Sequence, residues 1–175
     1  MKKPDLVILD ANVVIDAHKE NYWNSLIEGH KIHLPATVIR DEVQYFDAGN
    51  NNKKGIQLKP LIDKGFIFEI AATIDDEKQL QCLVKAQFLL AFDPGEREAL
   101  ALLKAQRYKN FFFCTGDKAA IKGLGILSLS EKGVSVENLL KKIGIKKNLK
   151  NHFTENWFQQ QLTQGFQERD LWTRR

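Results

Sequence analysis

The run DLVILD, residues 5–10, most constrains the fold of this chain. Its apolar residues do not alternate with polar ones, which is typical of a strand buried on both faces of a parallel sheet. Similar runs recur as KIHLP, GFIFEIA, NFFFCT and LGILSLS. Between them, segments such as DEKQLQCLVKAQFLLAF and EREALALLKAQRY carry apolar residues at helical spacing. This alternation predicts an α/β fold with a mostly parallel sheet covered by helices on both sides.

Length and composition favour one compact domain. A chain of 175 residues with 43% hydrophobic content is long enough for one substantial core and short for two domains. The start MKKPDLVILD has too short an apolar run for a signal peptide, and no stretch is long and apolar enough for a membrane span, so we expect a cytoplasmic protein that does not contact membranes. Cys82 and Cys114 lack neighbouring His or Cys residues, so neither a disulfide framework nor a zinc site is expected.

Positive charge gathers in the last third of the chain. The net charge is +4, and the segment KKIGIKKNLKN contains five lysines and no acid. A solvated surface and a contact for a polyanion both remain open for this run. The tail that follows carries an aromatic stripe at helical spacing. We expect that stripe to pack on the same domain, with a dimer or partner surface as the alternative.

Acidic residues stand where a parallel sheet usually binds its ligands, at the carboxyl ends of the strands. Asp10 directly follows the first apolar run, and Asp117 follows NFFFCT by two residues. Glu42 and Glu96 lie on the helical segments after two strands, each on the face expected to be buried. Glu98 is expected to point roughly opposite to Glu96, so Glu96 is preferred.

Each acid also has a structural interpretation. Asp10 can cap a helix, Asp93 and Glu96 form a D-x-x-E capping box, and Asp117 can form a turn after Gly116. Glu42 can be an ordinary surface acid. Four acids at strand ends or on buried helix faces are harder to explain as independent coincidences than a single one.

Carboxylates gathered in a cleft repel one another unless a cation neutralises them. An all-oxygen set suits Mg²⁺ or Mn²⁺, whereas zinc favours His or Cys. Such an ion can polarise a phosphodiester and activate water for its hydrolysis. A basic chain with an acidic cleft therefore predicts a nuclease.

Four motifs carry a resemblance to a known family: LDANVVID, LPATVIRDEV, DPGEREALALL and FFFCTGDKAAI follow one another in the order and spacing of the PIN-domain ribonucleases. The resemblance covers about residues 5–130. It implies a three-layer α/β/α fold with a parallel sheet of about five strands in the order 3-2-1-4-5. It also implies a nuclease domain at 1–135. The tail carries no motif of the family, and from its own residues we expect a basic and aromatic helical extension at 136–175 that packs on the same domain.

The resemblance further implies metal-dependent cleavage of RNA with four metal-binding, catalytic acids, which are Asp10, Glu42, Glu96 and Asp117. Asn12 and Thr115 match the small polar residues that orient such a site, and Glu98 is a further supporting candidate. Many relatives carry another acid where this chain has Lys118, Ala119 and Ala120, which leaves a second metal ion open. Candidate contacts for RNA are Lys118, Lys122, Lys146 and Lys147.

By analogy, the biological setting is the toxin of a toxin–antitoxin pair, with an antitoxin protein as partner and a homodimer as a further expectation. The alternative is a non-catalytic or decayed PIN-like module that binds nucleic acid. A phosphatase of the haloacid dehalogenase type also begins with an apolar strand ending in Asp, but it requires a second acid where this chain has Asn12.

Overall fold

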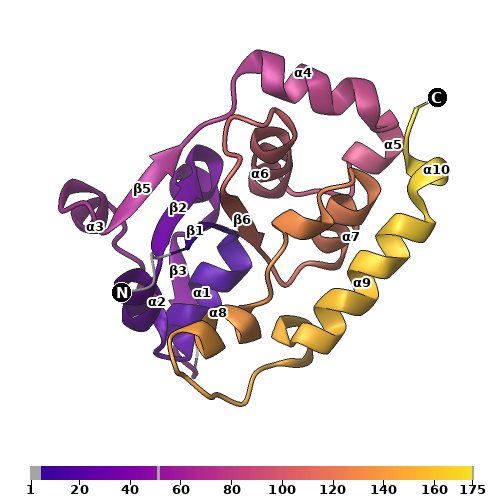
Figure 1. Cartoon of the computed structure of the whole chain (residues 1–175). Helices are drawn as coiled ribbons and strands as arrows, with labels where there is room; N and C mark the ends of the chain where they lie inside the picture. The colour runs from indigo at the N-terminus through magenta and orange to yellow at the C-terminus, as the bar shows by residue number, and fades with distance from the viewer. Residues whose placement is uncertain (1–4, 51, 175) are drawn as a thin grey trace.

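A parallel sheet of four strands forms the centre of the protein, with helices on both faces (Figure 1). The structure is a computed structural model that describes residues 5–50 and 52–174. The strand order is β5-β2-β1-β6. The strands are β1 (Leu6–Leu9), β2 (Lys31–Pro35), β5 (Ile67–Ile70) and β6 (Phe111–Cys114).

Alternate side chains of β1 enter two separate cores, as expected for a strand covered on both faces. Val7 and Leu9 pack in one core, and Ile8 packs in the other. The first core is covered by α1 (Ala11–Lys19), α2 (Trp23–Gly29) and α8 (Val136–Lys142). The second is covered by α4 (Ile74–Leu83), α6 (Pro94–Lys104), α7 (Lys118–Ile126) and α9 (Glu155–Gln167).

The predicted order of the first four strands is confirmed, but the predicted fifth strand is wrong. The run LGILSLS does not form a strand, because Leu124 and Ile126 belong to the buried helix α7. A short apolar run does not distinguish a buried strand from a buried helix. Beyond β6, Gly133 pairs with Phe113 as an isolated parallel bridge, and no further strand follows there among the described residues.

The predicted long helix from Asp76 to Phe92 is also interrupted. It forms α4 and the short α5 (Ala86–Leu89), separated at Val84. Val84 is extended and pairs with Thr173 of the tail in an antiparallel bridge. Tertiary pairing with a distant segment therefore overrides helical periodicity here.

Smaller elements complete the fold. An antiparallel hairpin joins β3 (Tyr45–Asp47) and β4 (Lys53–Gly55). The remaining helical elements are η1 (Val38–Glu42), α3 (Lys59–Asp63), η2 (Ser130–Lys132), η3 (Asn151–Phe153) and α10 (Arg169–Trp172). No helix in the described ranges is long and apolar enough to cross a membrane.

The C-terminal part wraps around the domain (Figure 1). Helix α9 lies along α7 at very close range, since a Cβ on Gly165 would lie 2.2 Å from the Lys122 carbonyl oxygen. Residues 143–153, here called the connecting segment, join α8 to α9 and pass beside α1. Phe158 and Leu162 of the predicted aromatic stripe are buried, whereas Phe166 remains 63% exposed. The stripe thus packs only in part.

Candidate functional site

Asp10 lies at the point where β1 ends and α1 begins. Its Oδ1 atom accepts a hydrogen bond from the Ala11 N–H at 2.7 Å, so Asp10 caps the helix. Its Oδ2 atom accepts a hydrogen bond from the Thr115 hydroxyl at 2.7 Å. Because Thr115 follows β6, this second bond ties together the ends of the neighbouring strands β1 and β6. Asp10 is therefore both a cap and part of a buried polar cluster.

Asp117 has the same dual role at the start of α7. Its Oδ1 atom accepts hydrogen bonds from the N–H groups of Ala119 at 2.6 Å and Ala120 at 3.0 Å. Its own N–H donates to the Thr115 Oγ1 atom at 2.9 Å. The Thr115 hydroxyl therefore joins the Asp10 carboxylate to the backbone of Asp117.

Asn12 supports the same strand ends. Its side-chain oxygen accepts a hydrogen bond from the Gly116 N–H at 3.3 Å, and its amide nitrogen lies 3.5 Å from Thr115 Oγ1. The structure thus brings Asn12, Thr115, Asp10 and Asp117 into one connected cluster.

Glu96 and Glu42 approach this cluster from the N-terminus of α6. Glu96 Oε2 accepts a hydrogen bond from the Asp93 N–H at 3.0 Å, which forms the predicted capping box. Glu42, at the end of η1, accepts a hydrogen bond from the Gly95 N–H at 2.8 Å. A Cβ on Gly95 would lie 2.6 Å from Glu42 Oε2, so the absence of a side chain permits this approach.

Glu98 is oriented differently from Glu96 but is equally buried. Its two carboxylate oxygens accept hydrogen bonds from the N–H groups of Thr37 and Ala72, each at 3.0 Å. These residues follow β2 and β5, so Glu98 fastens two strand ends to α6. The expectation of a single buried face on α6 was too simple, because its first turns lie over the end of the sheet and are enclosed on both sides.

Burial and mutual repulsion perturb the acids of the cluster. Desolvation by burial raises the pKa of Asp10 to about 7, and the charges of Glu42 and Asp117 add to this increase. Burial also raises the pKa of Glu96 to about 9, with further contributions from Asp10 and Asp117. The pKa of Glu42 is raised as well, mainly by burial. These shifts indicate that Glu42 and Asp117 act on Asp10, and that Asp10 and Asp117 act on Glu96. Asp10, Glu42, Glu96 and Asp117 are here called the four-acid site.

Each acid of the four-acid site has one oxygen fixed by a backbone N–H. Within residues 5–50 and 52–174, the other carboxylate oxygens of Glu42, Glu96 and Asp117 accept no hydrogen bond. This leaves oriented oxygen donors of the type that Mg²⁺ and Mn²⁺ prefer. However, no three His, Cys, Asp or Glu side chains of the described residues lie in a ready-made metal-holding geometry. The donor chemistry fits a hard cation, but the side chains would have to move closer together around it.

The candidate lysines are not equally placed. Lys118 is exposed at the first residue of α7, next to Asp117. Lys122 forms an ion pair with Glu168 of the tail at 2.7 Å, so an acid of this chain already balances its charge. The Lys147 ammonium donates a hydrogen bond to the carbonyl oxygen of Glu20, just beyond the C-terminus of α1. Asp10 caps the other end of that helix, about 15 Å away at 1.5 Å per residue.

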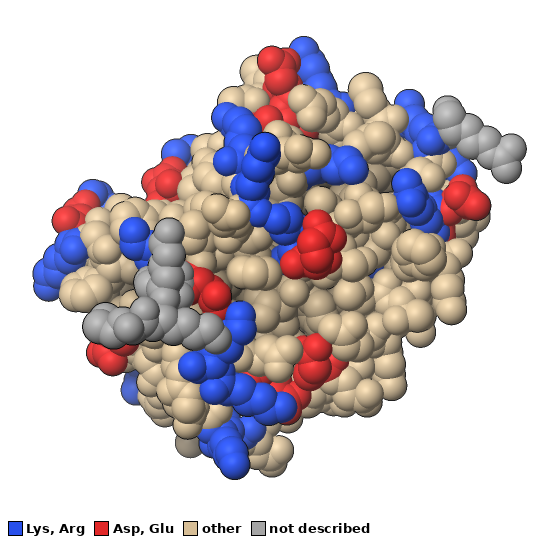
Figure 2. Space-filling model, in the orientation of Figure 1, with Lys and Arg blue, Asp and Glu red and all other residues tan. Residues whose placement is uncertain are grey.

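Lys146 and Lys147 are therefore remote from the four-acid site. Around them, basic groups gather at the lower edge of the view, over α8 and the connecting segment, with acidic groups beside them (Figure 2). The lysine run is largely paired within the chain: Lys142, Lys147 and Lys150 approach Asp5, Glu20 and Asp16, respectively.

One wall of the cluster was not predicted from the sequence, because it comes from the distant connecting segment. Phe153 of the connecting segment packs so tightly on Gly116 that a Cβ there would lie 2.4 Å from the Phe153 ring, and His152 is nearly as close. The only local signal was a glycine between two polar residues after a strand, which can indicate close approach of another segment. The identity of the approaching segment was not visible.

No protein-family model, curated protein or solved structure matches the chain. Functional assignment consequently depends on the residues and geometry described above.

Proposed function

We propose that this chain is a PIN-like, Mg²⁺- or Mn²⁺-dependent endoribonuclease that hydrolyses phosphodiester bonds at the four-acid site. The observation that carries the proposal is a group of four acids, each with one oxygen fixed by a backbone N–H, that lie close enough for Glu42 and Asp117 to act on Asp10, and for Asp10 and Asp117 to act on Glu96. Carboxylates that only cap helices do not have to lie near one another. The raised pKa values of Asp10 and Glu96 further support a site that is incomplete without a positive charge.

The side chains have distinct roles in this proposal. Asp10, Glu96 and Asp117 hold the ion through carboxylate oxygens, and Glu42 contributes from η1. Thr115 and Asn12 keep the strand ends in register through their hydrogen bonds. When bound, the ion supplies a Lewis acid for the phosphodiester and activates water. Lys118, exposed beside Asp117, is placed to contact a phosphate of the RNA.

The fold supports the PIN-like assignment at a coarse level. The sheet order of the first four strands, the two helical layers and the acids at the carboxyl ends agree with the arrangement that the resemblance implies. Toxin of a toxin–antitoxin pair is the proposed setting, again by analogy. In that setting an antitoxin protein covers the acidic cleft, with an Arg side chain reaching the carboxylates.

The second candidate is a nucleic-acid-binding module without catalysis. One observation favours it: among the residues described, the acids do not form a ready-made metal-holding group. The response to Mg²⁺ or Mn²⁺ distinguishes the two candidates. A nuclease binds the ion between its acids and becomes active, whereas a decayed site neither binds the ion nor cleaves RNA.

The test is cleavage of single-stranded RNA by the purified protein in EDTA, Mg²⁺ and Mn²⁺, beside Asp10→Asn and Asp75→Asn. Asp75 is an exposed acid in the first turn of α4 and serves as the matched control. We expect metal-dependent cleavage by the wild type and Asp75→Asn, and its loss in Asp10→Asn. Equal, metal-independent cleavage by all three proteins would contradict the proposal. RNA binding without cleavage in any condition would support the second candidate.

A further inference from the structure

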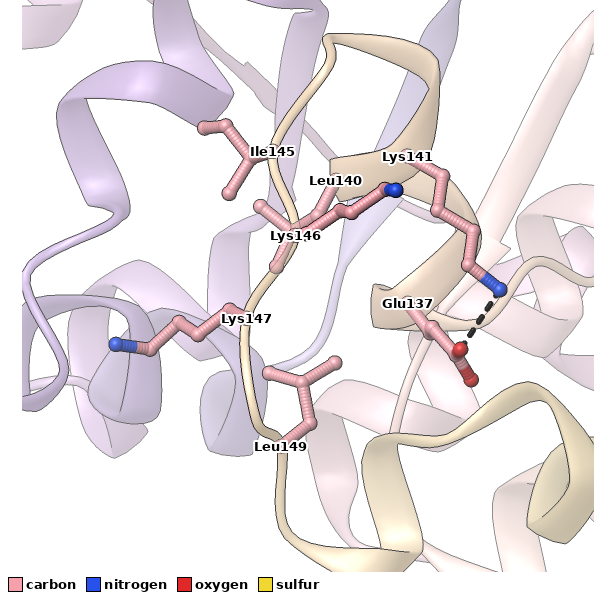
Figure 3. Close-up of a pocket in the computed structure, with 7 residues that line it drawn as sticks. All are labelled: Glu137, Leu140, Lys141, Ile145, Lys146, Lys147 and Leu149. Atoms are coloured by element: carbon pink, nitrogen blue, oxygen red, sulfur yellow. Dashed lines mark ion pairs between the residues drawn. The ribbon is translucent and has the colours of Figure 1, made fainter.

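A pocket of about 240 Å³ lies between α8 and the connecting segment, away from the four-acid site (Figure 3). Its apolar lining comes from aliphatic side chains that continue the core beneath, and its rim carries lysines. Leu140 is 1% exposed, while Ile145 and Leu149 are partly buried against the first core. The pocket thus combines an apolar floor with a cationic mouth. The lining residues are Leu140, Ile145 and Leu149 on the floor, with Glu137, Lys141, Lys146 and Lys147 around it.

The pocket is formed by the way α8 ends. Gly144 adopts a left-handed conformation with φ +80°, and its N–H donates to the Lys141 carbonyl at 3.1 Å. The Ile145 N–H donates to the Leu140 carbonyl at 2.9 Å. These two bonds define a Schellman motif, which brings the residue after the glycine back onto the last turn of the helix. Ile145 and Leu140 are therefore held together by the backbone before any ligand arrives.

The charges at the mouth are not balanced. Glu137 is the single acid of the lining, and both of its oxygens are engaged, by Lys141 at 2.7 Å and by the Glu155 N–H at 2.7 Å. Lys147 points away from the pocket in Figure 3, toward Glu20. Lys146 extends across the pocket on the side of Lys141. In the described part of the chain, Lys146 forms no ion pair.

We propose that this pocket binds an acidic segment of a partner protein, which inserts one bulky apolar side chain between Leu140, Ile145 and Leu149. A carboxylate next to that side chain meets Lys146 at the rim. Burial of the apolar group supplies most of the affinity, and the lysine selects acidic partners. Because the pocket is preformed, little ordering opposes binding. The inference is independent of the proposed nuclease activity.

An acidic peptide fits the pocket better than RNA does. Among the described residues, no aromatic side chain lines the pocket. Single-stranded RNA is usually held by stacking of its bases on aromatic rings. A polynucleotide also needs a series of unpaired cations along its backbone. The neighbouring Lys142, Lys147 and Lys150 instead approach acids of this chain. One unpaired lysine above an apolar floor suits a short acidic segment.

The test is fluorescence anisotropy with a fluorescein-labelled peptide in which one leucine is flanked on both sides by aspartates and glutamates. We expect saturable binding by the wild-type protein, weakened about tenfold by Lys146→Glu. Lys64→Glu, a charge reversal at an exposed lysine after α3, is expected to bind like the wild type. Replacing the leucine of the peptide with serine is expected to weaken binding about tenfold to a hundredfold.

Three outcomes would overturn the inference. Equal affinity for the leucine peptide and the serine peptide would show that charge attraction at the surface, and not the apolar floor, accounts for the binding. Displacement of the peptide by oligouridylate, with affinity for that RNA lost in Lys146→Glu, would make the pocket a nucleic-acid contact. Absence of peptide binding, with concentration-dependent self-association that Lys146→Glu removes in sedimentation, would assign the pocket to a second copy of the chain.

Discussion

Replacing Asp10 with Asn tests whether the carboxylate is maintained at the expense of stability. Asp10 is 4% exposed, and its pKa rises from 3.8 to about 7 in the folded protein. A folded-state pKa above the unfolded value means that the protonated carboxyl stabilises the fold at low pH. This stabilisation is lost as the pH rises from about 4 through 7. At pH 8 the ionised Asp10 therefore opposes folding when no cation is present.

The magnitude follows from the pKa change. Raising the pKa from 3.8 to about 7 corresponds to about 4 kcal/mol at about 1.4 kcal/mol per pKa step. Asn retains the helix cap, because it is as good an N-cap residue as Asp. The weakened hydrogen bond with Thr115 offsets about 1 kcal/mol of the gain. We expect Asp10→Asn to raise the free energy of unfolding by about 2–3 kcal/mol at pH 8 in EDTA.

The assay is urea unfolding followed by tryptophan fluorescence at pH 4.5 and pH 8, with EDTA or with excess Mg²⁺. At pH 4.5 the gain should nearly vanish, because Asp10 is protonated in the folded wild type. Excess Mg²⁺ should stabilise the wild type at pH 8 and leave Asp10→Asn almost unchanged. An equal loss of stability in Asp10→Asn at both pH values would refute the reasoning, since it would identify Asp10 as an ordinary structural cap.

Three further substitutions test the packing around the site. Gly116→Ala should destabilise the protein by about 1–3 kcal/mol in urea, because its Cβ would overlap the Phe153 ring; Gly55→Ala, whose nearest neighbour is 4.0 Å away, should be neutral, and equal effects would contradict the predicted contact. Glu98→Gln should lower the unfolding free energy by about 1–3 kcal/mol, because one buried N–H loses its acceptor; an unchanged urea midpoint would argue against that role. Gly144→Ala should cost about 1–2 kcal/mol at φ +80° and weaken binding of the acidic peptide, and undiminished binding would show that the Schellman turn does not shape the pocket.

The strands and their acids could be predicted from the sequence because the signals are local. DLVILD and NFFFCT are apolar on both faces, and an acid directly after such a run must lie at the sheet edge. Asp10 and Asp117 lie beside the same strand ends, where Thr115 joins the Asp10 carboxylate to the Asp117 backbone. Capping a helix and joining the cluster are not alternatives, because one oxygen of each acid accepts a hydrogen bond from a backbone N–H at or near a helix start. The second oxygen of Asp10 accepts a hydrogen bond from the Thr115 hydroxyl, whereas those of Glu42, Glu96 and Asp117 accept no hydrogen bond among the described residues.

Features that depend on distant segments could not be predicted. The apolar run at Leu124 predicts a strand, but it belongs to the helix α7, which packs closely against α9. A short apolar run alone does not distinguish a buried strand from a buried helix. The burial of Glu98 depends on two N–H groups from separate strand ends. The pairing of Lys142, Lys147 and Lys150 with Asp5, Glu20 and Asp16 likewise exists only in three dimensions. Through its contact with Glu20, Lys147 holds the connecting segment beside the end of α1.

Direct Mn²⁺ binding measured by calorimetry is the sharpest test of the four-acid site. At pH 7, in buffers of different ionisation enthalpy, we expect one saturable site in the wild type, with release of about one to two protons as Asp10 and Glu96 ionise. Asp10→Asn should lose the site, whereas Asp75→Asn should keep it. Absence of Mn²⁺ binding by the wild type, or binding that survives Asp10→Asn without proton release, would contradict the account.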